Sequence, residues 1–462
     1  MENTESNKGE LGNGLKTRHL TMMGLGSAIG AGLFLGTGVG IRAAGPAVLL
    51  AYLIAGIIVV LVMQMLGELA AARPASGSFA TYARQAHGHW AGFTLGWLYW
   101  FMLIMVLGAE MTGAAAIMGA WFDVAPWIPA LVCVIFFAVV NFTQVRGFGE
   151  FEFWFAFIKV AVILLFLVVG VLLIFGLLPG STFVGTSNFL SQGFMPHGIS
   201  GVAAGLLAVA FAFGGIEIVT IAAAESENPS VAIRTAVHSV IWRIAVFYLG
   251  AVLVITFLMP YDTISGADSA AESPFTIVLK MANIPGVVGF MEAVIVLALL
   301  SAFNAQIYAT SRLCHSLARE GDAPRIFAVT NRNDVPINAV ILSMVFAFVS
   351  VGLQWANLSG LLDFLLNAVG GCLLVIWIVI ATSYLKLHPE LERNNEIATV
   401  RLPGYPVLPI LALVLLAGLV ILMLFDQGAR SEITSVSVIV VVLIVLSFFS
   451  RRSTQRSAAR SK

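Results

Sequence analysis

The apolar residues of this chain are gathered into about twelve runs of roughly 18 to 28 residues each. A helix of that length crosses a hydrocarbon core about 30 Å thick, because each residue adds about 1.5 Å. Only 10% of the 462 residues are Asp, Glu, Lys or Arg, whereas about a quarter are charged in soluble domains. The runs therefore predict an all-α integral membrane protein and exclude a soluble globular one.

The polar segments between the runs are short, and none is long enough for an inserted soluble domain. We expect the limits of each span to be correct to within a few residues. The expected spans are 20–45, 47–71, 90–119, 127–144, 150–177, 198–224, 238–259, 284–311, 337–354, 358–385, 406–425 and 432–450.

Lys and Arg are distributed unevenly between the two sides of these spans. Of the 24, 20 lie on the side that holds both termini, including Arg243 at the start of the seventh run. The other side has Arg42, Lys280 and Arg430, and Lys159 lies within a run. Because short cytoplasmic loops carry the excess of Lys and Arg, we expect a multi-pass plasma-membrane protein with both termini in the cytoplasm.

Charge and cysteine content exclude several other classes. The 24 basic and 24 acidic residues balance, which gives no indication of nucleic-acid binding. The three cysteines lack CxxC spacing and the histidines lack ligand-like spacing. We therefore expect no disulfide, no metal and no cofactor, and the sequence indicates no obligatory protein partner.

Glycines interrupt the first and sixth spans. The first reads GLGSAIGAGLFLGTG at 24–38, and the sixth reads FAFGGIE at 211–217. Each glycine destabilises a helix by about 1 kcal/mol relative to alanine, so both clusters favour unwinding at mid-membrane. Unwound backbone is tolerated there only where it lines a cavity or binds something. The alternative is close helix packing through Gly26 and Gly30, or through Gly32 and Gly36.

A pair of unwound segments suits a zwitterionic ligand. A half-helix N-terminus offers amides to an anion, and loose carbonyls attract a cation; an α-amino acid carries both charges. The first and sixth spans occupy corresponding places if spans one to five and six to ten are two repeats. Paired interruptions of this kind indicate the binding site of a transporter.

Four strings resemble the amino-acid permeases of the amino acid-polyamine-organocation superfamily. They are GSAIGAGLF at 26–34, FIKV at 157–160, FAFGGIEIVTIAAAESENP at 211–229 and SRLCHSLAREGDAPRIF at 311–327. The resemblance covers about residues 15 to 450, with the motifs in order. Within the superfamily the chain looks like the bacterial amino acid transporter family, and it is most similar to the aromatic amino acid permeases of actinobacteria.

The resemblance implies a LeuT-type fold, in which two inverted five-helix repeats are followed by two further helices and helices 1 and 6 are interrupted. It also implies a division of the chain into consecutive parts. These are a cytoplasmic tail at 1–18, a transport core at 19–385 with repeats at about 19–177 and 198–385, two additional helices in 386–450 and a basic cytoplasmic tail at 451–462.

By similarity, backbone groups at the two breaks would hold the substrate. The amides expected to receive the substrate carboxylate are those of Gly30, Ala31 and Gly32. The carbonyls expected to receive the ammonium are those of Ala28, Phe211 and Gly214. Gly215 would complete the second break, and the side chain expected to cover the bound molecule is that of Phe213 or Phe211.

Three ionisable residues lie inside spans, where charges are expensive and indicate function. By similarity, Lys159 would place its amine where sodium-coupled relatives hold a sodium ion; the alternative is that it extends to the cytoplasmic interface. Glu110 and Glu217 could each load and release a proton, and Glu217 could contact the substrate ammonium. Structural bracing is the alternative for both.

Three polar residues of the eighth span, Asn304, Gln306 and Tyr308, could line the substrate path. Hydrogen bonding between helices is the alternative for all three. Glu68, Glu292 and Asp363 lie nearer to span ends and are expected to be interface or loop-closing groups.

The chain is therefore expected to be a secondary active permease, driven by the proton gradient, that takes up aromatic amino acids. The same fold could instead carry γ-aminobutyrate, proline or other neutral amino acids. A membrane-embedded enzyme is the remote alternative, because HExxH, GxSxG and paired intramembrane aspartates are missing from the sequence. A channel would more often combine several copies of fewer spans around a shared pore.

Overall fold

The computed structural model describes residues 29–73, 78–143, 148–215, 217, 235, 238, 241–264, 273–331, 335–397, 401–425 and 427–460, and within these ranges it is all-helical, without strands. Eight apolar helices are long enough to cross a membrane, and one of them, Gly32–Ala72, covers two expected spans. Shorter apolar helices at Trp127–Phe142, Gly198–Ala212 and Val407–Met423 match the fourth, sixth and eleventh spans. Together these helices account for the twelve spans expected from the sequence.

The spans occur in the expected order. They are η1 (Gly32–Gly36) with α2 (Thr37–Ala44), α3 (Val48–Ala72), α5 (His89–Phe122), α6 (Trp127–Thr143), α7 (Phe148–Ile174), α8 (Gly198–Ala212), η3 (Ile244–Leu249) with α11 (Gly250–Leu258), α13 (Val287–Arg319), α14 (Ile337–Trp355), α15 (Leu361–Arg393), α16 (Val407–Met423) and α17 (Gln427–Arg460). The connecting segments contain η2 (Gly45–Ala47), α4 (Ser78–His87), η4 (Tyr261–Thr263), α12 (Pro274–Met281) and η5 (Arg325–Ala328).

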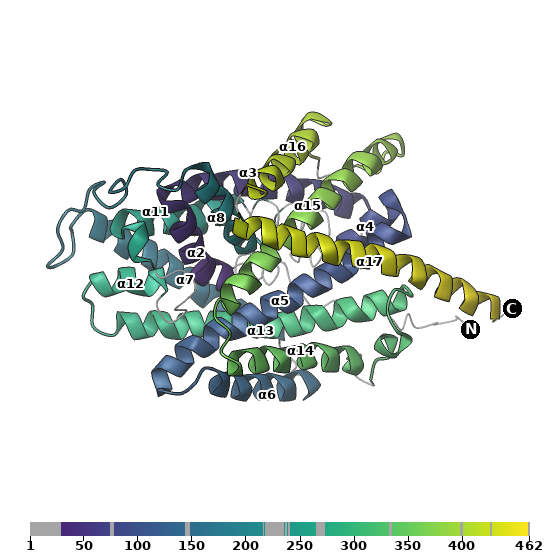
Figure 1. Ribbon diagram of the computed structural model, residues 1–462, viewed down its shortest axis with the longest axis horizontal. Coiled ribbons are helices and arrows are strands. Elements are labelled where there is room, and N and C mark those ends of the chain that lie inside the picture. The colour runs from purple at the N-terminus through teal and green to yellow at the C-terminus, as the bar shows by residue number, and fades with distance from the viewer. Residues whose placement is uncertain are drawn as a thin grey trace, which may run out of the picture.

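The long helices α5 and α13 lie side by side through the centre of the bundle, and α14 and α6 pack along one edge (Figure 1). Large apolar side chains are exposed on the outer helices, for example Val168 at 58% and Val441 at 58%. In water such a surface would be unfavourable, whereas lipid tails are as apolar as these side chains. The exposed surface is therefore that of a membrane protein.

Several helices differ from the expected spans. α13 and α15 continue past 311 and 385 to Arg319 and Arg393, and α17 continues to Arg460 through the segment expected as a basic tail. The extension of α15 packs against the protein, because His388 and Leu391 are buried. Hydropathy identifies the apolar part of a helix that crosses the membrane, but it does not detect polar turns that extend the helix beyond the membrane.

The connection between α3 and α5 contains an unexpected helix, α4. Its buried residues Phe79, Tyr82, Ala83 and Ala86 recur at the spacing of one helix face. The spacing of the apolar residues in this segment indicates an amphipathic helix. The expected spans were chosen from long apolar runs, and this spacing does not produce such a run. α4 packs against α5 and α15.

One end of the bundle, which we call the basic end, carries Arg73, Arg84 and the ends of α3, α13 and α15. Here the buried carboxylate of Glu68 accepts hydrogen bonds from Tyr384 Oη at 2.9 Å and from the Leu402 amide at 2.6 Å. His388 Nδ1 lies 2.7 Å from the same carboxylate. Glu68 therefore joins α3 to α15 and to the loop that follows α15, which is the loop-closing role expected for it.

The segment after α13 is fixed at the basic end by Asp322, within the string at 311–327. Its carboxylate pairs with Arg84 and lies 2.7 Å from His89 Nε2. The indole of Trp97 donates to the Asp322 carbonyl at 3.0 Å. This motif therefore links α13 to α4 and α5.

Candidate functional site

In the first span the described helix starts at Gly30–Gly32, which we call the first break after the interruption expected there; residues 20–28 of this span lie outside the described residues. The amides of Leu33 and Phe34 both donate to the Gly30 carbonyl, at 3.2 and 3.1 Å. The helix then begins with the π-helical turn η1 and continues without interruption into α2. Gly30, Ala31 and Gly32 are thus brought to a helix start, as expected, while Ala28 lies outside the described residues.

The helix start of the first span lies against the end of α8 in the sixth span. A Cβ on Gly32 would lie 2.7 Å from Ala212 Cα and 3.2 Å from the Phe211 ring, and one on Gly36 would lie 3.5 Å from the Ala208 carbonyl. The pair Gly32 and Gly36 therefore allows α8 to approach closely. The packing alternative for Gly32 and Gly36 is therefore confirmed beside the helix start, whereas Gly26 lies outside the described residues.

The sixth span leaves its helix at Ala212. The amides of Phe213 and Gly214 donate to the carbonyls of Ala210 and Phe211, at 3.0 and 2.9 Å. Gly215 follows with φ at +87°, a conformation that other residues rarely adopt. The expected break is present, and the Phe211 carbonyl already accepts one hydrogen bond there.

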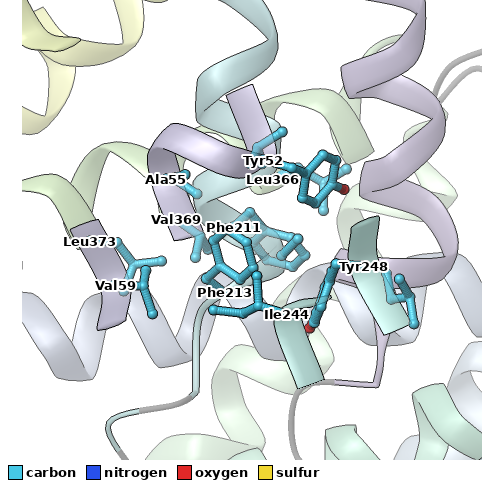
Figure 2. Close-up of a cluster of buried hydrophobic side chains, with 14 of the residues drawn as sticks. Tyr52, Ala55, Val59, Phe211, Phe213, Ile244, Tyr248, Leu366, Val369 and Leu373 are labelled. Atoms are coloured by element: carbon cyan, nitrogen blue, oxygen red, sulfur yellow. The ribbon is translucent and has the colours of Figure 1, made fainter. Parts of the chain in front are cut away.

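An aromatic cluster, formed by Tyr52, Phe213 and Tyr248, lies beside this break. The ring centroid of Phe213 is 5.9 Å from that of Tyr52 and 5.1 Å from that of Tyr248, and all three side chains are fully buried. Figure 2 shows these rings together with Phe211 and apolar side chains of α3 and α15. The Tyr52 hydroxyl lies 3.1 Å from Thr37 Oγ1 on α2, so the cluster also contacts the first span.

Glu110 and Lys159 lie inside the protein near the first break. The Ala31 amide donates to both carboxylate oxygens of Glu110, at 3.1 Å each. Lys159 is 1% exposed, so its ammonium does not extend to an interface, and Nζ donates to Ser301 Oγ at 3.3 Å. Lys159 and Glu110 attract each other across the site. The structure therefore brings both residues to the first break.

Glu217 lies at the second break, together with Arg243 from the start of the seventh span. The Gly215 amide donates to Glu217 Oε1 at 3.2 Å. Arg243 is fully buried and interacts electrostatically with Glu217. None of the three guanidinium nitrogens has a hydrogen-bond partner in the part of the chain that the structure describes. Arg243 was counted among the charges of the cytoplasmic side, and its place beside Glu217 was not expected.

A sequence signal for Arg243 was available. The string IWRIAVFY at 241–248 surrounds it with apolar residues, so no polar loop segment encloses it. The aromatic cluster was missed for a different reason. Tyr52 and Tyr248 lie in separate spans, and only the packing of α3 against η3 brings them together.

Asn304 and Gln306 lie farther along α13 and do not contact the breaks through the hydrogen bonds that the structure describes. The amide of Asn141 on α6 donates to Asn304 Oδ1 at 2.9 Å. The Gln306 carbonyl accepts from Thr310 at 2.7 Å, within α13. This bond joins α6 to α13, which is the hydrogen bonding between helices given above as the alternative role of Asn304.

The loop helix α12 covers the far side of the first break. The hydroxyl of Ser273, which precedes α12, donates to the Phe34 carbonyl in η1 at 2.8 Å. The ring of Phe275 packs against Phe34 with centroids 5.2 Å apart. Among the described residues, no group of three or more His, Cys, Asp or Glu side chains could hold a metal ion.

A helix start in the first span that faces the end of α8 in the sixth span, with buried charges beside both, is typical of a membrane transport protein. Comparison with known families agrees: the family described as amino acid permease matches residues 19–459. The chain belongs to the amino acid permease family and is a multi-pass protein of the plasma membrane. The resemblance carried by the four strings is thereby confirmed.

Individual relatives are similar over nearly their whole length. The chain is 74% identical to the aromatic amino acid transport protein AroP of Corynebacterium glutamicum over 98% of each chain. It is 39% identical to the γ-aminobutyric acid permease of Bacillus subtilis, over 96% of this chain and 95% of that one. It is 33% identical to AroP of Escherichia coli K12 over 96% of each.

Proposed function

We propose that this permease takes up phenylalanine, tyrosine and tryptophan together with protons. The observation that carries the choice of substrate is the 74% identity to a protein named as an aromatic amino acid transporter. The second candidate is γ-aminobutyrate, because permeases named for it share 39 to 40% identity with the chain.

The geometry supports binding of an α-amino acid between the two breaks. The Ala31 amide opens a helix and already binds a carboxylate, so it suits the substrate carboxylate. The Phe211 carbonyl has a second lone pair for the ammonium. An aromatic substrate ring would be accommodated next to the aromatic cluster, where ring pairs are worth about 0.5–1.5 kcal/mol beyond their buried area.

Three buried ionisable residues support coupling to protons. Lys159, Glu110 and Glu217 are each no more than 3% exposed. A charge held away from water is expensive unless it is paired or neutralised by a proton. The protonation state of each residue is therefore expected to change when the residue gains or loses access to water. The excess of Lys and Arg at the basic end supports a cytoplasmic location for that end and for both termini.

The test is uptake into proteoliposomes that contain the purified protein. Labelled phenylalanine should accumulate under an inward proton gradient, whether the external cation is sodium, potassium or choline. Unlabelled tyrosine and tryptophan should compete, and γ-aminobutyrate and proline should not. Competition by γ-aminobutyrate alone would favour the second candidate, and a requirement for sodium would contradict proton coupling.

A further inference from the structure

The contact between Glu110 and Ala31 joins two distant parts of the chain at the first break. The Ala31 amide donates to Oε1 and Oε2 at equal distances of 3.1 Å, across a sequence separation of 79 residues. Both residues are buried, with Ala31 at 0% and Glu110 at 3% exposure. A buried carboxylate is costly unless its hydrogen bonds are satisfied. The amide is therefore a principal stabilising partner of this carboxylate.

This amide is available because of the way in which the helix begins. The first amides of a helix have no partner within it, and they favour an anion. Ala31 stands directly before Gly32, where the helical stretch of η1 and α2 starts and then runs to Ala44. An amide in the helix interior would already be bonded to a carbonyl one turn earlier.

The Ala31 amide has room for one carboxylate at a time. A Cβ on Gly30 would lie 2.5 Å from Glu110 Oε1 and 3.2 to 3.3 Å from the other carboxyl atoms, so the Glu110 carboxylate fills the space beside the break. On the opposite side, Gly32 is in contact with Ala212 and Phe211 of the sixth span. Two carboxylates crowded at one donor would also repel each other.

Under the proposed function, on which this inference rests, the same amide receives the substrate carboxylate. We infer that Glu110 and the substrate carboxylate are alternative ligands of the Ala31 amide, and that Glu110 takes up a proton when the substrate replaces it. The neutral carboxyl no longer competes as an anion. The proton then travels with the substrate, and the site holds one anion before and after the exchange.

The groups that face Glu110 are consistent with such an exchange. Lys159 on α7 and the phenol of Tyr248 on η3 interact with it electrostatically, and the Ala31 amide is its hydrogen-bond donor. Lys159 stays in place through its bond to Ser301 on α13. Its positive charge attracts whichever carboxylate occupies the amide, so it compensates the substrate anion once Glu110 is neutral.

The test measures phenylalanine binding to the purified full-length protein between pH 5.5 and 8.5. Where one proton is taken up on binding, the affinity of the wild-type protein should fall by up to about tenfold for each unit by which the pH rises. Addition of phenylalanine to a weakly buffered sample should raise its pH. Glu110→Gln should bind phenylalanine with an affinity that does not change with pH, should take up no proton and should lose accumulation while retaining exchange across the membrane.

A matched control is Glu292→Gln, which removes a carboxylate in an exposed contact with Trp121 and should behave as wild type. Retention of the wild-type pH dependence by Glu110→Gln would overturn the exchange and leave the proposed function intact. Loss of binding by folded Glu110→Gln at every pH would also overturn it. Failure of the wild-type protein to bind any aromatic amino acid would overturn both the exchange and the proposed function.

Discussion

Lys159 Nζ donates a hydrogen bond to Ser301 Oγ at 3.3 Å, which joins α7 to α13 inside the protein. The two helices belong to the fifth and eighth spans, which fall in different halves of the expected repeat. An ammonium at this position bonds the neighbouring helix and is remote from water, since Lys159 is 1% exposed. The position suits a fixed or titrating cation and offers no route to an interface.

Replacement of Lys159 should leave insertion into the membrane intact and abolish accumulation of substrate against a gradient. Lys159→Ala removes the cation, and Lys159→Arg supplies a larger planar cation that has no accessible neutral form. Both variants should insert yet lose concentrative phenylalanine uptake by at least about tenfold. Ser301→Ala keeps the charge and should lose less. Full accumulation by well-expressed Lys159→Ala would show that the ammonium has no part in coupling.

A side chain at Gly32 should abolish binding without preventing insertion. Gly32→Val would place its Cβ 2.7 Å from Ala212 Cα, so α8 and the first span would have to separate. Phenylalanine affinity should fall by more than about tenfold, in line with the steep cost of small displacements at a binding site. Gly418→Val is the control, because nothing lies within 4 Å of a Cβ at Gly418. Normal phenylalanine binding by Gly32→Val would contradict the placement of the substrate site beside this glycine.

Arg243 should support both stability and function. Its guanidinium is fully buried and interacts electrostatically with the buried carboxylate of Glu217. Arg243→Met would leave that carboxylate without its positive neighbour, and removal of one partner of a buried charge pair is destabilising by about 3–5 kcal/mol. The variant should therefore insert, melt at a lower temperature and lose transport, whereas Arg401→Met, at an exposed ion pair with Glu392, should change neither property. An unchanged melting temperature would show that groups other than Arg243 stabilise Glu217.

The ion pair between Arg73 and Glu396 should stabilise the basic end in a pH-dependent manner. Its atoms are 2.6 Å apart, and the Arg73 guanidinium lowers the pKa of Glu396 below its ordinary value of 4.5. The stabilisation is thus fully present above pH 4.5 and is lost as the pH falls through the lowered pKa. The melting temperature of Glu396→Gln should be below that of wild type at pH 7, and the difference should vanish in acid. An equal difference at all pH values would exclude the ion pair as its cause.

Much of the fold could be predicted from the sequence because lipid imposes a simple rule, namely that about twenty apolar residues form each span. The glycine cluster at 211–217 likewise indicated where the helix of the sixth span ends, and the cluster at 24–38 contains the start of the described helix in the first span. Contacts between distant segments could not be predicted in this way. The bond from Ala31 to Glu110 depends on how α5 packs against the first span, and neither hydropathy nor spacing contains that information.

The errors share one cause. α4 and the extension of α15 are polar enough to resemble loops, and their helical structure depends on partners such as Glu68 and Asp322 that lie far away in sequence. The contact between Arg243 and Glu217 was not predicted because hydropathy gives the depth of a residue poorly near a span end. Whether an arginine there points toward lipid headgroups or into the core is decided by neighbouring helices.

The carboxylate of Glu68 has a consequence for motion within the transporter. It is bonded to Tyr384, His388 and the Leu402 amide at once, and sliding α3 past α15 would break these bonds in a buried setting. Each unsatisfied buried group would cost about 1–3 kcal/mol. At the basic end we therefore expect α3 and α15 to move together during transport, and we expect the hinges that change access to the site to lie elsewhere, as at the glycines of the sixth span.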